Sequence, residues 1–230
     1  IELSNIFKKE EFKVFSDPAN DNNSRIAALI VPEGHKIGRG QIDRYTEFVK
    51  EFGAKGLAYI KVEGDNVSDL ASPILKYLSE KCLTNIMTTL NVKKGDLIFF
   101  GAGKEKIVND YMSRLITKLG DDLDLLEGDF AACWVTEFPM FEEASDGSLT
   151  SLHHPFTCPF ETDLEKLGKL NPLEINSKAY DMVINGVEIG GGSIRIHNKT
   201  LQEKVFQLLG LSEAEAQTKF GFFLKTLTTG

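Results

Sequence analysis

The sequence predicts an α+β protein, with an α/β domain over residues 1–122 followed by an antiparallel-sheet domain over residues 123–230. Three observations support this division. Strand-like and helix-like apolar patterns alternate up to about residue 120, as in a compact α/β domain. The acidic loop Gly120–Asp124 ends the alternation. The turn dipeptides Asp146-Gly147 and Asn185-Gly186 then each separate two strand-like runs, which is typical of β-hairpins.

Composition describes an ordinary globular chain of 230 residues, 42% hydrophobic and 26% charged. The net charge of -8 argues against a broad nucleic-acid footprint, because nonspecific phosphate binding needs a surplus of lysine and arginine. Cys82, Cys133 and Cys158 are odd in number and widely spaced, so we expect neither a disulfide framework nor a structural zinc site, and a cytoplasmic location. Cys133 alternates with apolar neighbours, which favours a core position.

Targeting signals are not evident at the start of the chain. No apolar run approaches the roughly 20 residues of a membrane span, and Ile1 leads directly into a charged segment. Because the chain opens without an initiator methionine, we expect a piece of a longer protein.

Apolar spacing assigns the elements of the first domain. Period-2 or continuous apolar runs predict strands, and apolar residues three and four apart predict helices. The expected strands are residues 12–15, 25–31, 57–62 and 97–100, and the expected helices are residues 41–52, 72–78, 83–90 and 104–119. The polar cluster Asp17–Ser24 predicts a turn, so two strands flank a loop near the start.

The segment Gly101–Lys104 superficially resembles a phosphate-binding loop. The Walker pattern needs glycine where Ile98 stands and serine or threonine where Glu105 stands. We therefore assign Gly101–Lys104 to an ordinary turn.

The second domain is predicted to contain two hairpins and two helices. The strands are residues 130–141 with 149–156, and residues 179–184 with 187 onward. One helix carries Leu201 and Val205 and ends at Gly210, and the next opens with the capping box Ser212 to Glu215.

The stretch Val187–His197 contains three consecutive glycines, Gly190, Gly191 and Gly192. Glycines inside a strand remove every side chain, which suits a place where a ligand or another backbone approaches closely. Beyond them, polar and isoleucine residues alternate, so a strand displays the polar ones on one face: Ser193, Arg195 and His197, opposite Ile194 and Ile196.

Two charged side chains flank the glycines. The planar guanidinium of Arg195 suits bidentate binding of a carboxylate or phosphate, and Glu188 can hold a metal ion or an amine. The alternative is a glycine-bulged edge strand whose Arg195 and Glu188 are solvated.

The adjacent pair His153-His154 lies at the exit of the first hairpin. Neighbouring residues on a strand point to opposite faces, so the pair is poorly placed to chelate one metal ion. We expect one imidazole to face a ligand and the other to pack, and two structural histidines are the alternative.

Four ordered motifs resemble bacterial-type aspartyl-tRNA synthetases of class II. They are Phe138–Glu142, Leu152–Thr157, Ala179–Gly186 and Glu188–His197. The first half is similar to the insertion domain, called GAD, that these enzymes share with a subunit of the tRNA-dependent amidotransferase, through residues 25–29, 45–48 and 53–62. Asparaginyl and lysyl enzymes lack this Gly-Gly-Gly-Ser run and the insertion domain, and are disfavoured.

The resemblance implies a ligand for each charged group. By position, Arg195 would clamp the side-chain carboxylate of L-aspartate, His153 would contact the amino acid, and Glu188 would serve ATP through Mg²⁺. His154, Gly190, Gly191, Gly192, Ser193 and His197 would shape the pocket. The implied reaction forms aspartyl-adenylate and transfers aspartate to tRNA(Asp), mainly by positioning and charge neutralisation, with no protein nucleophile. A homodimeric parent enzyme is implied, with no membrane or DNA partner.

The chain also departs from that family. Nothing resembles the anticodon-binding barrel or the three class II signature motifs, and the chain stops at Thr228–Gly230 just before the third would begin. We therefore expect a fragment, a GAD-like domain plus part of a catalytic domain, that is inactive alone. In an unbroken strand Glu188 and Arg195 face opposite sides, so a site using both requires a bulge or kink among the glycines.

Two other functions remain open on the sequence. One is a non-catalytic module that binds tRNA or protein through residues 1–120. A basic patch formed by Lys36, Arg39, Arg44, Lys50 and Lys55 would support it. The other is a metal-dependent hydrolase that uses His153, His154 and Glu188.

Overall fold

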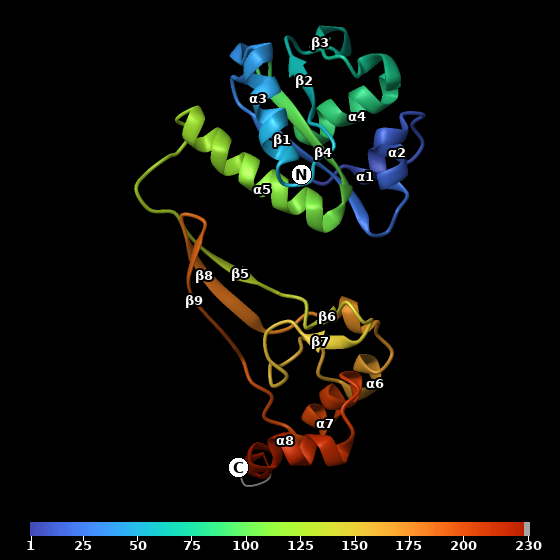
Figure 1. Cartoon of the computed structure of the whole chain (residues 1–230), viewed down its shortest axis with the longest axis vertical. Helices are drawn as coiled ribbons and strands as arrows, with labels where there is room; N and C mark the ends of the chain where they lie inside the picture. Colours follow the sequence, from blue (N-terminus) through green and yellow to red (C-terminus); the bar gives the residue numbers. More distant parts are fainter. Residues whose placement is uncertain (228–230) are drawn as a thin grey trace. The chain divides into compact units, whose positions relative to one another are not determined.

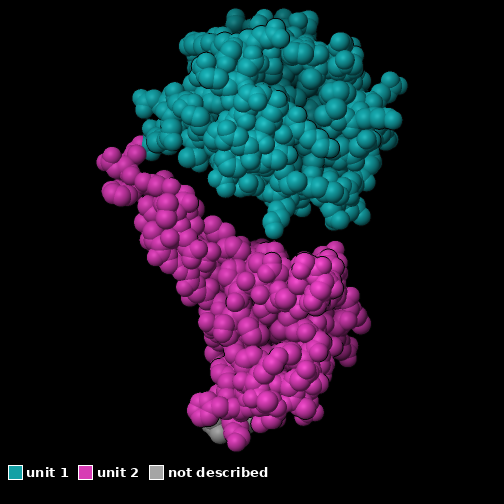
Figure 2. All heavy atoms as spheres, in the orientation of Figure 1, with its two compact units in different colours: residues 1–127 teal, residues 128–230 magenta. Residues whose placement is uncertain are grey.

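The computed structural model describes residues 1–227. The chain divides into two compact units, residues 1–127 and residues 128–230, the second described up to residue 227 (Figure 2). Helices and antiparallel sheets mix in the chain, so the α+β class is confirmed. The sequence analysis placed the boundary at residue 122. Thr228, Thr229 and Gly230, where we expected the chain to stop short of the third motif, lie outside the described residues.

The first unit is built on a four-stranded sheet with the order β1-β4-β2-β3 (Figure 1). All three strand pairings are antiparallel, so the alternation of strands and helices along this unit does not build a parallel sheet. The strands are β1 (Ser24–Val31), β2 (Ala58–Val62), β3 (Leu70–Ala71) and β4 (Leu97–Lys104).

Helices cover both faces of this sheet, because strand β4 is apolar on both sides. Leu97 and Phe99 face a cluster formed with α3 and α5, whereas Ile98 and Phe100 face a cluster formed with α1, α2 and α4. The helices are α1 (Ser4–Phe7), α2 (Lys13–Ala19), α3 (Arg39–Lys50), α4 (Glu80–Leu90) and α5 (Glu105–Asp122).

The predicted strand at residues 12–15 is wrong, because helix α2 begins at Lys13. Phe15 and Ala19 stand four residues apart, so a helix buries both on one side. The Phe15 ring lies 4.7 Å from that of Phe7, between ring centroids. Short-range alternation was the weaker signal here, and burial of the aromatic rings decided the conformation.

Two further corrections concern segments around the sheet. The predicted helix over residues 72–78 is only a 3-10 turn at Leu75–Tyr77, although the Ser72 hydroxyl accepts from the Ile74 amide (3.2 Å) while donating to the carbonyl of Tyr59 on β2. The segment Gly101–Lys104 is not a turn: it continues β4 and pairs with β1, and α5 begins directly after it. A Cβ at Gly101 would lie 2.8 Å from the Tyr111 hydroxyl, so glycine lets α5 pack closely on the strand.

The second unit contains a three-stranded antiparallel sheet with the order β5-β8-β9 and a separate hairpin, β6-β7. Asn185 and Gly186 both have positive φ (51° and 77°), as a two-residue hairpin turn requires, and this turn confirms the predicted β8-β9 hairpin. The strands are β5 (Ala132–Thr136), β6 (Phe141–Glu143), β7 (Leu149–Ser151), β8 (Ala179–Ile184) and β9 (Val187–Ser193).

The expected single strand over residues 130–141 is wrong. Glu137, with φ of 60°, breaks it, and the two halves join different sheets: β5 pairs with β8, and β6 pairs with β7. Because β5 is an edge strand with both faces uncovered, Cys133 is exposed rather than in the core.

Three helices form two apolar clusters in the described part of the second unit: the first two pack with the β6-β7 hairpin, and the third packs on the second helix and Phe156. The helices are α6 (Leu164–Leu167), α7 (Lys199–Leu208) and α8 (Glu213–Thr226). The predicted capping box of Ser212 and Glu215 at the start of α8 is confirmed. Within residues 1–227, no helix combines the length and the apolar character that crossing a bilayer requires.

Candidate functional site

Arg195 lies just beyond the end of β9, where the chain pairs with a distant segment. The carbonyl of Ile194 accepts a hydrogen bond from the Cys158 amide (2.8 Å), and the Ile196 amide donates to the carbonyl of Phe156 (2.9 Å). These bonds flank an antiparallel bridge between Thr157 and Arg195. In such a non-hydrogen-bonded pair the two side chains stand close together on one face.

Ser193 shares this face with Arg195, as the alternation predicted. The buried Thr157 hydroxyl donates to the Ser193 hydroxyl at 3.2 Å, which ties the end of β9 to the histidine-bearing segment. The opposite face is only partly as expected, because Ile196 is buried but Ile194 remains 49% exposed. The sheet is uncovered at Ile194, whereas Ile196 reaches the cluster packed on α7.

His154 is the histidine that interacts with Arg195. Its Nδ1 accepts a hydrogen bond from the Phe156 amide (3.2 Å), which assigns the neutral ring proton to Nε2. Partial burial, and then the positive charge of Arg195, lower the pKa of His154. Both side chains remain accessible, and Arg195 has no carboxylate partner among residues 1–227. The site therefore presents an uncompensated cation beside a neutral imidazole.

The other two histidines near the site are placed differently. His153 packs edge-on against Phe138, with ring centroids 4.8 Å apart. His197 is exposed and lies outside the strand pairing that holds Arg195. His153 therefore lies against Phe138, whereas Arg195 acts on His154. The ligand-facing role of one imidazole, and the contact of His153 with the amino acid that the resemblance implies, stay predictions.

A β-bulge reorients Glu188. Met182 pairs with Gly190 but Val183 pairs with Glu188, so Ile189 is the extra residue on β9. The bulge moves Glu188 onto the face of Gly191, which supplies the irregularity that a site using Glu188 and Arg195 requires.

Asp181 joins Glu188 on that face, and the sequence analysis did not single it out from the other carboxylates. It pairs with Gly191 across the hairpin. A Cβ at Gly191 would collide with Oδ1 of Asp181 and lie 3.2 Å from Oε1 of Glu188. The two carboxylates therefore converge over the bare backbone of Gly191. The signal that could have found Asp181 is the hairpin register set by the Asn185-Gly186 turn, which places it opposite the glycine run.

The carboxylates and the guanidinium lie at opposite ends of one strand face. Six strand steps separate Glu188 from Arg195 once the bulged residue is discounted, which corresponds to roughly 20 Å. The site is therefore elongated, with an acidic end on the β8-β9 hairpin and a basic end at Arg195.

The reverse face of the sheet is apolar. Tyr180 lies across Gly192, where a Cβ would be 2.9 Å from the hydroxyl oxygen, and its ring centroid is 5.9 Å from that of Trp134. A shallow hollow of about 300 Å³ opens there over Gly190 and Gly191. The glycines therefore leave exposed backbone on both faces.

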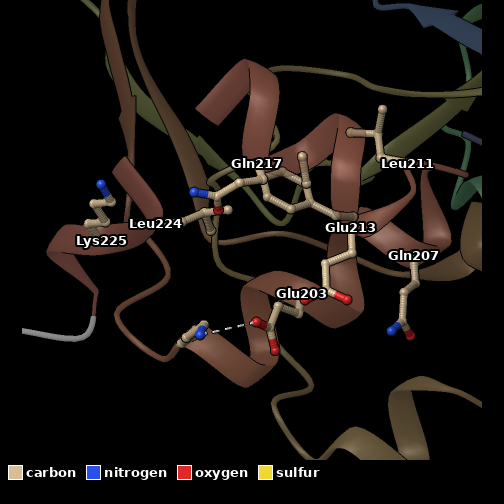
Figure 3. Close-up of a pocket in the computed structure, with 10 residues that line it drawn as sticks. Glu203, Gln207, Leu211, Glu213, Gln217, Leu224 and Lys225 are labelled. Atoms are coloured by element: carbon tan, nitrogen blue, oxygen red, sulfur yellow. Dashed lines mark ion pairs between the residues drawn. The ribbon is translucent and has the colours of Figure 1, made fainter. Parts of the chain in front are cut away.

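A larger pocket, of about 400 Å³, lies between α7 and α8 and is shown in Figure 3. Its floor is apolar, with Phe206 and Leu224, and its rim is charged, with Glu203 held 3.7 Å from the ammonium of Lys199. None of the predicted site residues lines it.

The structure gives less support to the two alternative functions, the metal-dependent hydrolase and the tRNA- or protein-binding module. In residues 1–227 no group of three or more His, Cys, Asp and Glu side chains could hold a metal ion, so the set required for a hydrolase is not assembled. In the basic patch, Lys36 and Lys50 are each paired with a glutamate, at 2.6 and 2.7 Å, which removes part of its uncompensated charge.

Residues 15–112 match the family model of the GAD domain. The match lies within the first unit, and the predicted GAD domain is thereby confirmed. GAD domains occur in aspartyl- and lysyl-tRNA synthetases, which are ligases, and in related proteins, so the match supports a synthetase-related origin. Our expectation that lysyl enzymes lack this domain is therefore wrong.

Proposed function

We propose that this chain is part of an aspartate–tRNA ligase, in which the second unit supplies the L-aspartate contacts and one ATP contact of the catalytic domain. The parent enzyme would activate L-aspartate with ATP to aspartyl-adenylate and then transfer aspartate to tRNA(Asp). The GAD domain supports the synthetase context. The choice of aspartate depends on the site of the second unit.

The observation that carries the proposal is the exposed Arg195 without a carboxylate partner in residues 1–227. A guanidinium binds a carboxylate through two parallel hydrogen bonds. The neighbouring His154 has a lowered pKa, so near neutral pH it adds no second positive charge and can donate from Nε2. An amino acid with an anionic side chain is the ligand that satisfies both groups.

The acidic end fits a nucleotide that arrives with a divalent cation. Asp181 and Glu188 present hard oxygen ligands over Gly191, and Mg²⁺ is usually held by one or two carboxylates together with substrate phosphates. Bound there, Mg²⁺ would neutralise phosphate charge. The residues of this chain would hold the ion and, through the bare glycines, leave room for substrate against the backbone.

Activity is expected only in the parent enzyme. The proposal assigns tRNA(Asp) binding and homodimer formation to that protein, and it predicts that this chain alone shows no aspartate-dependent exchange of pyrophosphate into ATP. Detectable exchange by the purified chain would contradict this part of the proposal.

Isothermal titration of L-aspartate into the chain tests the carboxylate site directly. A hydrogen-bonded charge contact contributes about 1.5–3 kcal/mol, so Arg195→Ala should weaken binding by roughly tenfold or more. L-Asparagine, which replaces the carboxylate by a neutral amide, should bind much more weakly than L-aspartate.

Lys199→Ala is the matched control, because it removes a positive charge four residues away that is paired with Glu203. It should leave the affinity for L-aspartate unchanged. If the Arg195 and Lys199 variants lose the same affinity for L-aspartate, the loss is due to the change in net charge rather than to a specific contact. If L-aspartate and L-asparagine bind equally well, Arg195 is not the carboxylate contact.

A further inference from the structure

Gln202 on α7 is a buried polar residue whose side chain makes one hydrogen bond within residues 1–227. Its side chain is fully enclosed, with a relative exposure of 0%. Nε2 donates a hydrogen bond to the carbonyl oxygen of Pro155 at 2.9 Å. Oε1 is also buried and has no hydrogen-bond partner among the described residues.

Packing does not explain a glutamine at this position. Burying an amide costs free energy unless its donors and acceptor are satisfied, and here the acceptor is not. An apolar side chain of similar length, such as methionine, would fill the same space without that cost. The remaining reason for glutamine is its one hydrogen bond to Pro155.

Pro155 is the centre of the turn that orients His154. Proline has no amide hydrogen, so its carbonyl is the one backbone group through which residue 155 can be held. Within the same turn, the Phe156 amide donates to Nδ1 of His154 (3.2 Å) and the Thr157 amide donates to the carbonyl of His154 (3.0 Å). The Gln202 bond therefore secures the peptide unit whose amide fixes the imidazole.

We propose that Gln202 is a positioning residue for the carboxylate site: by holding the Pro155 carbonyl, it directs the Phe156 amide to Nδ1 of His154 and so keeps the proton of that neutral ring on Nε2. The orientation of His154 by Gln202 follows from the contacts alone, whereas the role of His154 in binding L-aspartate rests on the proposed function. Arg195 is the charged group that acts on His154.

The test is the protonation pattern of the His154 ring, read from the ¹⁵N chemical shifts of its imidazole near pH 8 in the whole chain. The wild-type ring should show a predominantly unprotonated Nδ1. Gln202→Met keeps the volume and removes the donor, and it should shift the ring toward a mixture of both tautomers. Gln207→Met makes the same change at an exposed position of α7 and should leave His154 as in the wild type.

Gln202→Glu separates loss of the hydrogen bond from damage to packing. Burial raises the pKa of a carboxyl group, so above the lowered pKa of His154 and below that of the buried acid, the protonated acid can donate to Pro155 while the His154 ring is neutral. The wild-type signature should be kept in that interval. Ionisation at higher pH should abolish it. If Gln202→Met fails to fold, this pH-dependent loss decides the question. A wild-type His154 signature in folded Gln202→Met, or in ionised Gln202→Glu, overturns the inference.

L-Aspartate titration of the same proteins separates this inference from the proposed function. If the wild type shows the expected tautomer but binds no aspartate, the proposed function fails and the role of Gln202 in orienting His154 stands. If the wild type binds aspartate and Gln202→Met binds it equally well with an altered tautomer, the positioning role in binding is wrong.

Discussion

Replacing Gly191 by alanine tests whether Asp181 and Glu188 form one cation site. The added Cβ would collide with Oδ1 of Asp181 and crowd Oε1 of Glu188. The obstructing atoms are the side-chain ends of Asp181 on the central strand β8 and Glu188 on the edge strand β9, and neither side chain is buried, so they can rotate away. Gly191 does not have positive φ, so alanine brings no backbone strain. We therefore expect stability to change by less than about 1 kcal/mol.

The cost should appear in cation binding instead. The attraction between two unit charges 4 Å apart in water is about 1 kcal/mol, and a divalent ion doubles it to about 2 kcal/mol. Displacing one carboxylate should then weaken divalent-ion binding by roughly thirtyfold. Mn²⁺ serves as the probe, because it broadens the amide NMR signals of residues near it, and urea denaturation of the same protein measures stability.

Gly190→Ala is the matched control, because a Cβ there meets nothing within 4 Å. It should leave Mn²⁺ broadening as in the wild type. An unchanged Mn²⁺ affinity in Gly191→Ala, or an equal loss in both variants, would refute the shared site over Gly191.

Three further predictions concern reactivity and stability. Cys133 is exposed and should be alkylated rapidly by iodoacetamide in the native protein. Burial raises the pKa of the Cys82 thiol to about 12, so Cys82 should react only after denaturant is added. Mass spectrometry of the labelled peptides measures both reactions. Hydrogen bonds, chiefly from Lys104, lower the pKa of Asp21 to about 2, so the ionised carboxylate stabilises the fold above about pH 4 and this contribution is lost as pH falls toward 2. The melting temperatures of wild type and Asp21→Asn should therefore converge between about pH 4 and about pH 2. A difference in melting temperature that persists at about pH 2 would contradict this prediction. Gly34→Ala places a Cβ 2.6 Å from that of a buried leucine on β4 and should destabilise the first unit by about 1–3 kcal/mol in urea denaturation, where an unchanged midpoint would contradict the packing.

Local signals in the sequence determined much of the fold. The Asn185-Gly186 dipeptide predicted the β8-β9 hairpin, because a two-residue turn with positive φ at both positions requires such residues. Apolar spacing predicted α3, α4 and α5, because a helix buries residues three and four apart. The resemblance also identified the GAD domain, which the family match confirms.

Tertiary pairing decided the parts that local signals misjudged. The run Gly101–Lys104 has the composition of a turn, yet it is a strand because β1 supplies the hydrogen-bond partners. Residues 130–141 have the composition of one strand, yet they serve two sheets. In both places the outcome depends on a partner segment far away in the chain, which a local pattern does not contain.

The same distinction applies to the candidate site. The sequence alone identified Arg195, Glu188 and the histidine pair by residue type. It did not determine that Asp181 would meet Glu188, because that contact depends on a bulge in the hairpin ladder. Nor did it determine which imidazole would lie beside Arg195, because the bridge between Thr157 and Arg195 joins segments that are distant in sequence. The local sequence specifies the chemistry of each residue, but strand register and long-range pairing determine which side chains come together in a site.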